Sequence, residues 1–382
     1  MREPESFDVE ESVMAVEDDA GAGTKLIAWL GRLFVAIVIP LVTFAVLYAG
    51  FLFLRDSDAP KWLVTLVAIV WGVGGVAMLF WVFNGVVERL SDQWTARLQP
   101  FVFVGPAVAI LSWYLAIPVL RTFWLSLHDR NGQEFVGAAN YVAIFTERLM
   151  REAFRNNLLW IIFGATLSVL FGLLIAVLAD RSSWERTSKS LIFLPMAISF
   201  VGAGVIWNFM YEVRPVDLPQ IGLLNAIVVG LGGTPHPWPA WTAISPWNNL
   251  FLIVIVIWLQ VGFAMVLFSA ALKSIPEDLI EAGRVDGANE FQIFFRIMIP
   301  YIMGTIITVT TTIVIFTLKI FDVVWVMTGG QFGTEVIATQ FYRQSFVARN
   351  SGYGSAIAFI LLIAVIPVMI YNLGQFREQE AF

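Results

Sequence analysis

Long apolar stretches alternate with polar connections along this chain of 382 residues, and the stretches lack the two-residue alternation of half-buried strands. A helix that crosses the hydrocarbon core of a bilayer needs roughly 20 apolar residues, whereas the strands of a membrane barrel are roughly half as long and alternate. The pattern therefore predicts an all-α, polytopic membrane protein. We expect about eight transmembrane helices, at residues 26–54, 62–87, 101–120, 157–180, 190–211, 249–272, 299–327 and 355–376.

The composition also indicates a protein whose surface contacts lipid rather than water. Residues of the set AVILMFWYC make up 58% of the chain and charged residues 14%, whereas a soluble domain carries roughly 25% charged residues. Cys is absent and His occurs twice, which excludes disulfides, thiolate ligands and Cys nucleophiles and argues against a His-based metal centre. We therefore predict neither a metal site nor a catalytic site on this chain.

The polar segments divide the chain into three regions. Residues 1–24 carry eight acids and one base, Arg2, and are too polar to bury a core. We expect a disordered, acidic cytoplasmic tail there, and no basic surface remains for a nucleic acid. Residues 25–100 contain the first two spans and residues 101–382 the other six. Lys and Arg are nearly balanced between the two sides, so they do not set the orientation, but an even number of spans places both termini on one side.

The connection at residues 213–248 holds Trp238, Trp241 and Trp247 among several prolines. Because Trp rings favour the headgroup region of a bilayer, a rigid interfacial anchor is the plain interpretation. A docking surface for an external protein is the alternative.

The connection between the sixth and seventh spans is the most informative polar segment. Ser274 followed by Glu277 has the spacing of a capping box, and Asn289 followed by Gln292 repeats that spacing. Gly287 lies between them, where the chain must turn and a Cβ would be unfavourable. The pattern predicts two short helices at the membrane surface, joined by a turn.

The first of these helices would present Glu281 next to the small Ala282, so that another protein could approach closely around one negative charge. An ordinary solvated connection is the alternative interpretation. The segment from Glu281 to Pro300 resembles the EAA loop of ABC importer permeases, whose pattern runs E-A-A, three residues, G, then I-x-L-P. It departs from that pattern at Gly283, where a second Ala is usual, and at Ile299, where Leu is usual.

The resemblance implies that residues 273–300 lie in the cytoplasm and that the first short helix docks into a groove of an ATPase subunit, where the Glu pairs with a basic residue. It thereby supplies the orientation that the charges leave open. The residues implied in this coupling are Glu281, Ala282, Gly283, Asp286, Gly287 and Ala288.

Further segments resemble the carbohydrate-uptake branch of the same family. The resemblance implies the type I ABC importer permease fold, with a six-helix permease core at residues 101–382 after two extra transmembrane helices at residues 25–100, as in the larger subunit of maltose and α-glucoside transporters. The short connection at residues 121–156 favours the α-glucoside or glucosylglycerol type. The matching segments are Gly105-Pro106-Ala107, Phe135-Val136-Gly137, Asn140-Tyr141, Asn156-Asn157-Leu158, Gly172-Leu173, Leu194-Pro195, Trp207, Gly222-Leu223-Leu224-Asn225, Phe321-Asp322 and Thr328-Gly329-Gly330.

Polar residues at membrane depth are costly and are therefore candidates for a binding site. In maltose-type permeases the sugar lies against the fifth, sixth and seventh spans, and amides, hydroxyls and ammonium groups beside an aromatic face suit a sugar. The alternative is that Lys319 and Asp322 pair within one helix and that the threonines bond to their own backbone. The lining residues that follow from the polar positions and the resemblance are Gln260, Thr317, Lys319, Ile320, Asp322, Met196 and Phe200.

The resemblance also implies the partners and the location. They are a second permease subunit with six spans, two ATPase subunits, an external sugar-binding protein and the lipid of a bacterial plasma (inner) membrane, with both termini in the cytoplasm. The chain lacks the G-x-x-x-x-G-K-[ST] sequence that cradles phosphates. We therefore expect that it is not an enzyme, that it holds no cofactor of its own, and that ATP and Mg²⁺ are bound by the partner ATPase subunits.

A secondary solute carrier driven by an ion gradient is the main alternative. It would need intramembrane carboxylates for proton or sodium coupling, and only Asp322 qualifies clearly. A membrane-embedded enzyme would need a cluster of His, Asp or Glu at membrane depth, which the sequence does not show. A permease for an anionic solute such as glycerol 3-phosphate would need more cationic lining than Lys319 supplies.

Overall fold

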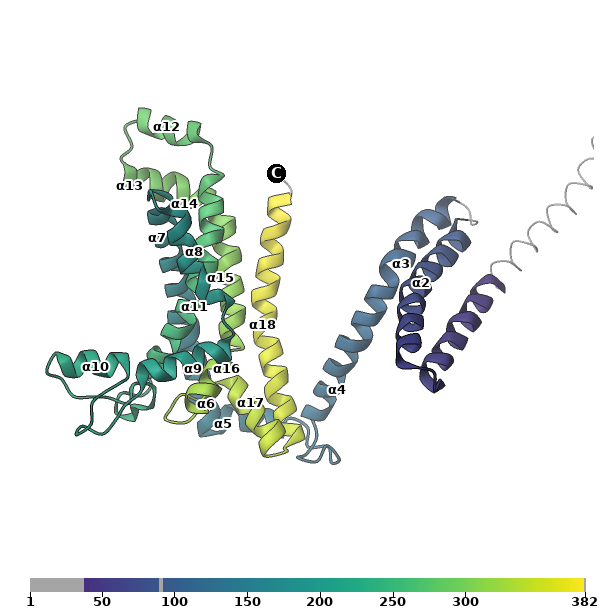
Figure 1. Ribbon diagram of the computed structural model, residues 1–382, viewed down its shortest axis with the longest axis horizontal. Coiled ribbons are helices and arrows are strands. Elements are labelled where there is room, and N and C mark those ends of the chain that lie inside the picture. Colours follow the sequence, from purple (N-terminus) through teal and green to yellow (C-terminus); the bar gives the residue numbers. More distant parts are fainter. Residues whose placement is uncertain (1–37, 89–91, 381–382) are drawn as a thin grey trace, which may run out of the picture. The chain divides into compact units, whose positions relative to one another are not determined.

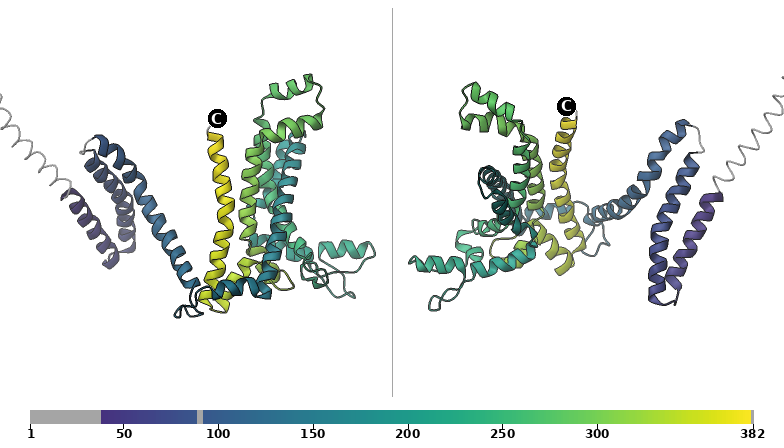
Figure 2. Two further views of the ribbon diagram at one scale, coloured as in Figure 1. Left: turned by 180° about the vertical axis from the view of Figure 1, so that it is seen from behind. Right: turned by 45° about the horizontal axis from the view of Figure 1, so that its top comes forward.

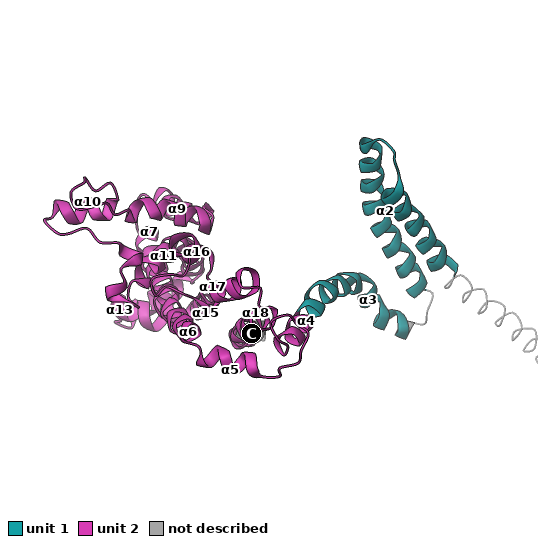
Figure 3. Ribbon diagram, turned by 90° about the horizontal axis from the view of Figure 1, so that it is seen from below, with its two compact units in different colours: residues 1–118 teal, residues 119–382 magenta. Residues whose placement is uncertain are grey.

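The computed structural model describes residues 38–88 and 92–380. The predicted acidic tail at residues 1–24 and the start of the first predicted span lie outside the described residues. Across the described ranges the chain is helical and forms no β-strand (Figure 1), which confirms the predicted all-α class. The contacts divide the chain into two compact units, residues 1–118 and 119–382 (Figure 3).

The first unit contains the two extra helices. A helix at Val38–Asp56 is followed by α2 (Lys61–Val87). A side chain at Gly50 would collide with the ring of Trp71, whose Nε1 donates to a backbone carbonyl of the first helix at 3.0 Å. α3 (Asp92–Leu111) packs against α2. Most apolar side chains of these helices are exposed, as expected for helices that contact lipid.

The third predicted span, residues 101–120, is part of a longer helix. α3 continues through the π-helical turn η1 (Ser112–Ala116) into α4 (Ile117–Ser126), and the continuous helix covers Gln93–Ser126. The predicted start of the six-helix core at residue 101 therefore falls inside a helix, whereas the contacts divide the chain after Pro118.

The second unit is built around α11 (Asn249–Lys273), the most buried of the candidate spans. α7 (Thr166–Asp180) lies along it, and at Gly172 the two helices are so close that a Cβ would collide with the facing helix. α15 (Met303–Leu318) packs on α11, and α18 (Ser351–Glu380) stands beside α15 (Figure 1).

The connection at residues 121–156 is folded. It contains α5 (Ala139–Thr146) and most of α6 (Arg148–Leu159), which continues through η2 (Trp160–Ala165) directly into α7. The fourth predicted span therefore belongs to a longer continuous helix at Arg148–Asp180.

The fifth predicted span is bent by 103° rather than continuous. It consists of α8 (Glu185–Phe193), the short η3 (Leu194–Ala197) and α9 (Phe200–Tyr211). Pro195 in η3 has no N–H to donate, and Ser199 begins a new helix because its Oγ accepts the N–H of the third helical residue at 3.0 Å.

The seventh predicted span is interrupted as well. η6 (Phe294–Met298) and α14 (Ile299–Tyr301) meet α15 at 69°, and α15 ends at Leu318 before α16 (Asp322–Thr328) begins. The prediction of one continuous helix over 299–327 is therefore wrong, because the N–H groups that follow Leu318 bond three residues back in tighter turns. By length and composition, the described residues contain six helices that could cross a membrane, or up to eight if each bent pair counts as one.

The short helices of the second unit gather at its two ends (Figures 1 and 2). α12 (Glu277–Val285) and α13 (Glu290–Ile293) lie at one end. α10 (Leu223–Gly230) and α17 (Ile337–Tyr342) lie at the other end, together with α5, α6, α9 and α16.

The Trp-rich connection packs partly on the protein itself. The ring of Trp241 stacks on His236 at 4.1 Å between centroids, and Trp238 packs against Phe251 at the start of α11. Trp247 is half exposed. The loop is therefore built on its own aromatic contacts, and the interfacial and docking interpretations both stay predictions.

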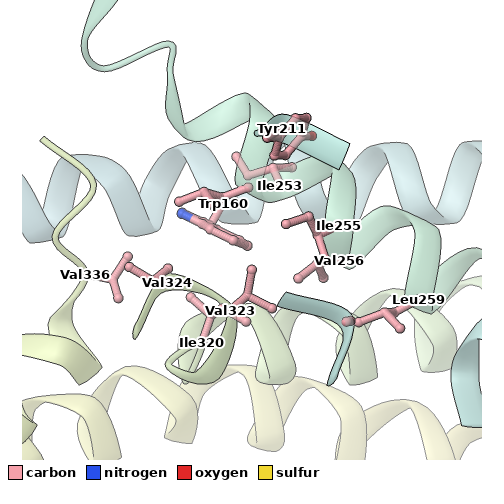
Figure 4. Packing of buried hydrophobic residues seen from close by; sticks show 12 residues of the cluster. Trp160, Tyr211, Ile253, Ile255, Val256, Leu259, Ile320, Val323, Val324 and Val336 are labelled. Carbon is pink, nitrogen blue, oxygen red and sulfur yellow. The ribbon is translucent and has the colours of Figure 1, made fainter. Parts of the chain in front are cut away.

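The main core of the second unit lies where α9, α11 and α16 meet η2. Trp160 is fully buried there among branched aliphatic side chains (Figure 4). The buried residues of this cluster are Trp160, Ala203, Tyr211, Leu252, Ile253, Ile255, Val256, Leu259, Ile320, Val323, Val324 and Val336.

Candidate functional site

Two adjoining cavities lie between the bend of the fifth span, the middle of α11 and the break after α15. They share Phe200, Gln260 and Phe316. The larger cavity, about 340 Å³, is also lined by Val256, Lys319, Ile320, Phe321 and Asp322. The smaller, about 160 Å³, is also lined by Met196, Ile198, Leu259, Phe263 and Thr312.

Three polar side chains of the larger cavity have no partner among the described residues. Gln260 is 5% exposed, and its amide makes no hydrogen bond there. Lys319 and Asp322 likewise form no ion pair within the described part of the chain. Lys319 caps the end of α15 and Asp322 begins α16, so the two do not pair within one helix. Because a buried amide normally has a partner, the unpaired Gln260 is available to a ligand. Lys319 is exposed and Asp322 is half-buried, and both face the same cavity.

Aromatic rings flank these polar groups. Phe200 and Phe316 lie 6.3 Å apart between centroids, at an angle of 36°. Thr312 also faces the cavity, but its hydroxyl donates to the Thr308 carbonyl at 2.8 Å. Directional polar groups beside aromatic faces can bind a polyhydroxylated ligand, since hydroxyls bond to the polar groups while C–H faces pack on the rings.

Close helix packing positions Gln260. At Gly262 a Cβ would lie 2.6 Å from the carbonyl oxygen of Ile192 and 2.8 Å from the Cα of Phe193. The backbones of α8 and α11 therefore touch two residues from Gln260, and η3, which follows α8, carries Met196 into the same cavity.

Thr317 does not line either cavity. It is fully buried, its hydroxyl donates to backbone carbonyls of Ile313 and Val314 at 3.1 and 2.9 Å, and its methyl group faces Gly164. It lies on the face of α15 that packs on η2, and its hydroxyl is used within the helix. Ile320 reaches the cavity, although most of its surface is in the core.

Asparagine side chains hold the surrounding loops; Asn156 and Asn157 belong to a segment that matches the family pattern, whereas sequence reasoning missed Asn248 and Asn249. Asn156 Nδ2 donates to the carbonyls of Gly333 and Glu335 at 2.9 and 2.8 Å. Asn248 and Asn249 also donate to carbonyls of the loop after α16. Each pair is a doubled Asn in the sequence, but only Asn248 and Asn249 stand at a helix start, because Asn156 and Asn157 lie inside α6.

The EAA-like loop, residues 273–300, forms the other candidate site. The predicted capping box at Ser274 is wrong: α11 runs on to Lys273, and the Ser274 hydroxyl donates back to the Ala271 carbonyl at 2.8 Å. The predicted box at Asn289 and Gln292 is confirmed, with both reciprocal bonds at 2.9 Å.

The two short helices of this loop pack on each other. Gly287 has a φ of 82° at the turn, a conformation that favours glycine. Gly283 is buried against η6, where a Cβ would lie 2.7 Å from Ile297 Cδ1. Arg284 Nε bonds to Glu290 Oε1 at 3.0 Å across the turn. The loop is therefore a folded unit and not an irregular connection.

The outward face of α12 is open. Glu281, Ala282 and Asp286 are exposed, Val285 is 86% exposed, and Ala288 is half-buried. Among the described residues, Glu281 forms no ion pair. A carboxylate beside small and apolar side chains at the tip of the bundle is an arrangement that a basic groove on another protein can contact.

Comparison with known proteins identifies the family. The model of the binding-protein-dependent transport system inner membrane component matches residues 168–377. The chain is 54% identical over 279 residues to the osmoprotective compounds uptake permease protein GgtC of Synechocystis sp., covering 73% of this chain and 99% of that protein. It is 48% identical over 302 residues to the alpha-glucoside transport system permease protein AglF of Rhizobium meliloti, covering 78% of this chain and 89% of that protein.

Solved structures share the fold. A chain of a bacterial ABC transporter involved in the import of the acidic polysaccharide alginate aligns with a TM-score of 0.63 at 20% identity, covering 75% of this chain and 99% of that chain. A chain of a bacterial alginate ABC transporter in complex with an alginate pentasaccharide-bound periplasmic protein also aligns with a TM-score of 0.63, at 19% identity, covering 74% of this chain and 96% of that chain. The type I ABC importer permease fold that the sequence implies is thereby confirmed. This chain therefore belongs to the family of inner membrane components of binding-protein-dependent transport systems, the permease subunits of ABC importers.

Proposed function

We propose that this chain is the larger, eight-span permease subunit of a bacterial ATP-driven importer for a neutral sugar: an α-glucoside, a disaccharide or glucosylglycerol. The observation that carries the proposal is the cavity in which Gln260, Lys319 and Asp322, without partners in the described chain, lie beside Phe200 and Phe316. The printed names of GgtC and AglF, which refer to osmoprotective compounds and alpha-glucosides, support it.

The charges of the cavity favour a neutral ligand. Lys319 and Asp322 line the same cavity with opposite charges, so the site offers donors and acceptors without a net charge. An anionic solute would be repelled by the carboxylate as strongly as the ammonium attracts it. A sugar can instead bond to both groups and to the Gln260 amide through its hydroxyls.

The EAA-like loop supports a role in coupling. In the proposed assembly, α12 docks into an ATPase subunit with Glu281 facing a basic residue and the small, exposed Ala282 allowing close approach, while Gly283 lets α12 pack on η6. Two ATPase subunits hold ATP and Mg²⁺, a six-span permease forms the other half of the path, and a sugar-binding protein delivers the substrate from outside. The loop and both termini lie in the cytoplasm, and the chain itself performs no chemistry.

The mechanism requires two states of the helix bundle. Closure of the ATPase subunits moves α12 and shifts the bundle from inward- to outward-facing as the loaded binding protein docks on the opposite side. Such a shift needs only that each partner binds one state better than the other. The sugar then enters the cavity at Gln260, and hydrolysis of ATP resets the bundle.

Reconstitution of the whole transporter tests this function. The chain is co-expressed with partner genes from its own genome, purified in nanodiscs, and assayed for ATP hydrolysis with binding protein loaded with trehalose, maltose, sucrose or glucosylglycerol. Stimulation by one loaded binding protein supports the proposal and identifies the sugar. Failure to co-purify any ATPase with the EAA-like loop intact would contradict it.

A further inference from the structure

A cluster of charged side chains fastens α8 to the ends of α7 and α11 nearest the EAA-like loop. Asp180 ends α7, Glu185 and Lys189 lie on α8, and Ser269 and Lys273 lie in the last turns of α11. Two acids and two bases make the cluster neutral overall. We call these five residues the α8 clamp.

Lys189 is the centre of the clamp. Its ammonium group donates to the carboxylates of Asp180 and Glu185, the latter at 2.6 Å, and to the hydroxyl of Ser269. An ammonium has three donors, and all three are used here. The Ser269 hydroxyl donates in turn to Asp180 Oδ1 at 2.7 Å, so that three helices are joined through one side chain.

The centre of the clamp is partly shielded from water, whereas the side chains of Glu185 and Lys273 at its edge are 34% and 52% exposed. The side chains of Lys189 and Asp180 are 18% and 16% exposed, and Ser269 is 4% exposed. Lys273 covers the outside by pairing with Glu185 and lying 3.8 Å from Asp180. Charge-assisted hydrogen bonds are stronger and more directional when water is partly excluded, so the clamp fixes α8 in one position.

A second contact holds the same helix. At Gly262, two residues from Gln260 on α11, the backbone touches that of α8 at Ile192, three residues after Lys189. α8 therefore rests on α11 at two points, one made by backbone packing and one by charged side chains. Two separated contacts prevent a helix from pivoting on its neighbour.

This fixed helix connects the two candidate sites. α8 leads directly into η3, which carries Met196, and then to Phe200, and both side chains line the cavity. α11 carries Gln260 and ends at Lys273, where the EAA-like loop begins. The α8 clamp thus joins α11, which leads into the EAA-like loop, to α8, which leads into the residues that line the cavity.

We propose that Lys189 is a positioning residue that makes α8 and α11 move as one body, so that a displacement of the EAA-like loop reaches Met196, Phe200 and Gln260 together. The inference rests on the importer function proposed above. Coupling between distant sites is carried by packed, rigid elements that both sites displace, and a loosened α8 would let the loop move without reshaping the cavity.

The test compares Lys189→Met with Arg186→Met in the complete transporter in liposomes. Arg186 is exposed on the same helix and forms no ion pair within the described residues, so it controls for the loss of one positive charge. For Lys189→Met we expect the sugar transported per ATP hydrolysed to fall about fivefold or more, while ATP hydrolysis without binding protein is kept. Arg186→Met should match the wild type.

A cross-linking experiment distinguishes a positioning role of Lys189 from a role in folding. The chain contains no Cys, so Lys189→Cys with Ser269→Cys places one pair of thiols on this subunit, and a short cleavable bifunctional thiol reagent can replace the span of the lysine side chain. We expect the double variant to be uncoupled before cross-linking, to recover sugar transport per ATP when bridged, and to lose it again when a reductant cleaves the bridge. If Lys189→Met does not assemble, Ser269→Ala removes a single partner and should cause a smaller loss.

Several results would overturn the inference. They are wild-type coupling in Lys189→Met, wild-type coupling in the double Cys variant before cross-linking, or a loss that cross-linking leaves unchanged. If no loaded binding protein stimulates even the wild-type transporter, the proposed function fails, and the inference fails with it.

Discussion

Asn157 holds the end of α15 from the side, because its Nδ2 donates to the backbone carbonyl of Leu318 at 3.1 Å. Its Oδ1 accepts the N–H of Ile337, the first residue of α17, at 2.9 Å. One buried amide therefore satisfies a backbone group at the end of one helix and another at the start of a second. These two hydrogen bonds stabilise the break between α15 and α16, which places Lys319 and Asp322 at the cavity.

Replacing Asn157 by Ala leaves two buried backbone groups without partners. We expect Asn157→Ala to lower the free energy of unfolding by about 1–3 kcal/mol, the cost of an unsatisfied buried hydrogen-bonding group. Thermal unfolding of the purified protein measures the change, with Asn131→Ala in an exposed turn as the control. Equal stability of the two variants would show that the break does not depend on this amide.

Gln260 is expected to contact the transported ligand. Gln260→Leu keeps the size of the side chain but removes the amide, and the loss of one hydrogen bond in a buried site corresponds to about 1.4 kcal/mol, or a tenfold rise in KM for transport. Initial rates of sugar uptake over a range of loaded binding protein give the KM. Gln93→Leu, at an exposed position on α3, should leave it unchanged. An unaltered KM in Gln260→Leu would remove this residue from the site.

The exposed carboxylate of Glu281 is expected to bind the ATPase subunit. Glu281→Lys reverses its charge at the surface of α12 and should uncouple or disassemble the complex while the bundle stays folded, since truncating or reversing a buried interface charge typically costs about 2–5 kcal/mol. Co-purification of the ATPase and sugar uptake measure the effect. Asp278→Lys on the same helix is the control, and normal co-purification and uptake in Glu281→Lys would refute the coupling role.

The loop after α16 introduces a pH dependence. Burial raises the pKa of the Glu335 carboxyl above its usual range, and Arg343, which donates to Glu335 Oε2 at 3.0 Å, opposes that rise only in part. The fold therefore binds the proton more tightly than the unfolded chain does, so this contribution to stability is present below the ordinary carboxyl pKa and is lost as the pH rises through the raised value.

We accordingly expect the Tm of the purified protein to fall as the pH increases through the raised pKa, and Glu335→Gln to flatten that fall because an amide does not ionise. Glu134→Gln, at an exposed position, should keep the wild-type profile. Parallel profiles for all three proteins would show that Glu335 does not contribute to the pH dependence.

The sequence predicts the helical class and the second box of the EAA-like loop because both depend on local patterns. The apolar stretches predict helices, and the capping box of α13 is formed by two residues, Asn289 and Gln292, that are only three positions apart in the sequence. The bends are not visible in that way. The charged residues Lys319 and Asp322 follow Leu318, but the residue that holds the break, Asn157, lies 161 residues away in the sequence. Ser274 fails as a cap because it immediately follows the last residue of α11, Lys273, and Pro276 is the residue that precedes α12.

The candidate cavity could be located in part from helical spacing. Counting back from Ile320 in steps of four residues reaches Phe316 and Thr312, which both line it, and this periodicity was the signal that would have found them. The neighbouring position Thr317 points to the opposite face of α15 and packs against Gly164. A polar residue at membrane depth therefore indicates a site only when its face of the helix is also known.

Uptake of labelled sugar into proteoliposomes that contain the complete transporter tests the central claim most directly. ATP is enclosed with the ATPase side, loaded binding protein is added on the other side, and ionophores dissipate all ion gradients. The account predicts uptake that requires ATP and binding protein and persists with the ionophores. Uptake that proceeds without ATP and stops when the ionophores are added would instead indicate an ion-driven carrier in which Asp322 is the coupling carboxylate.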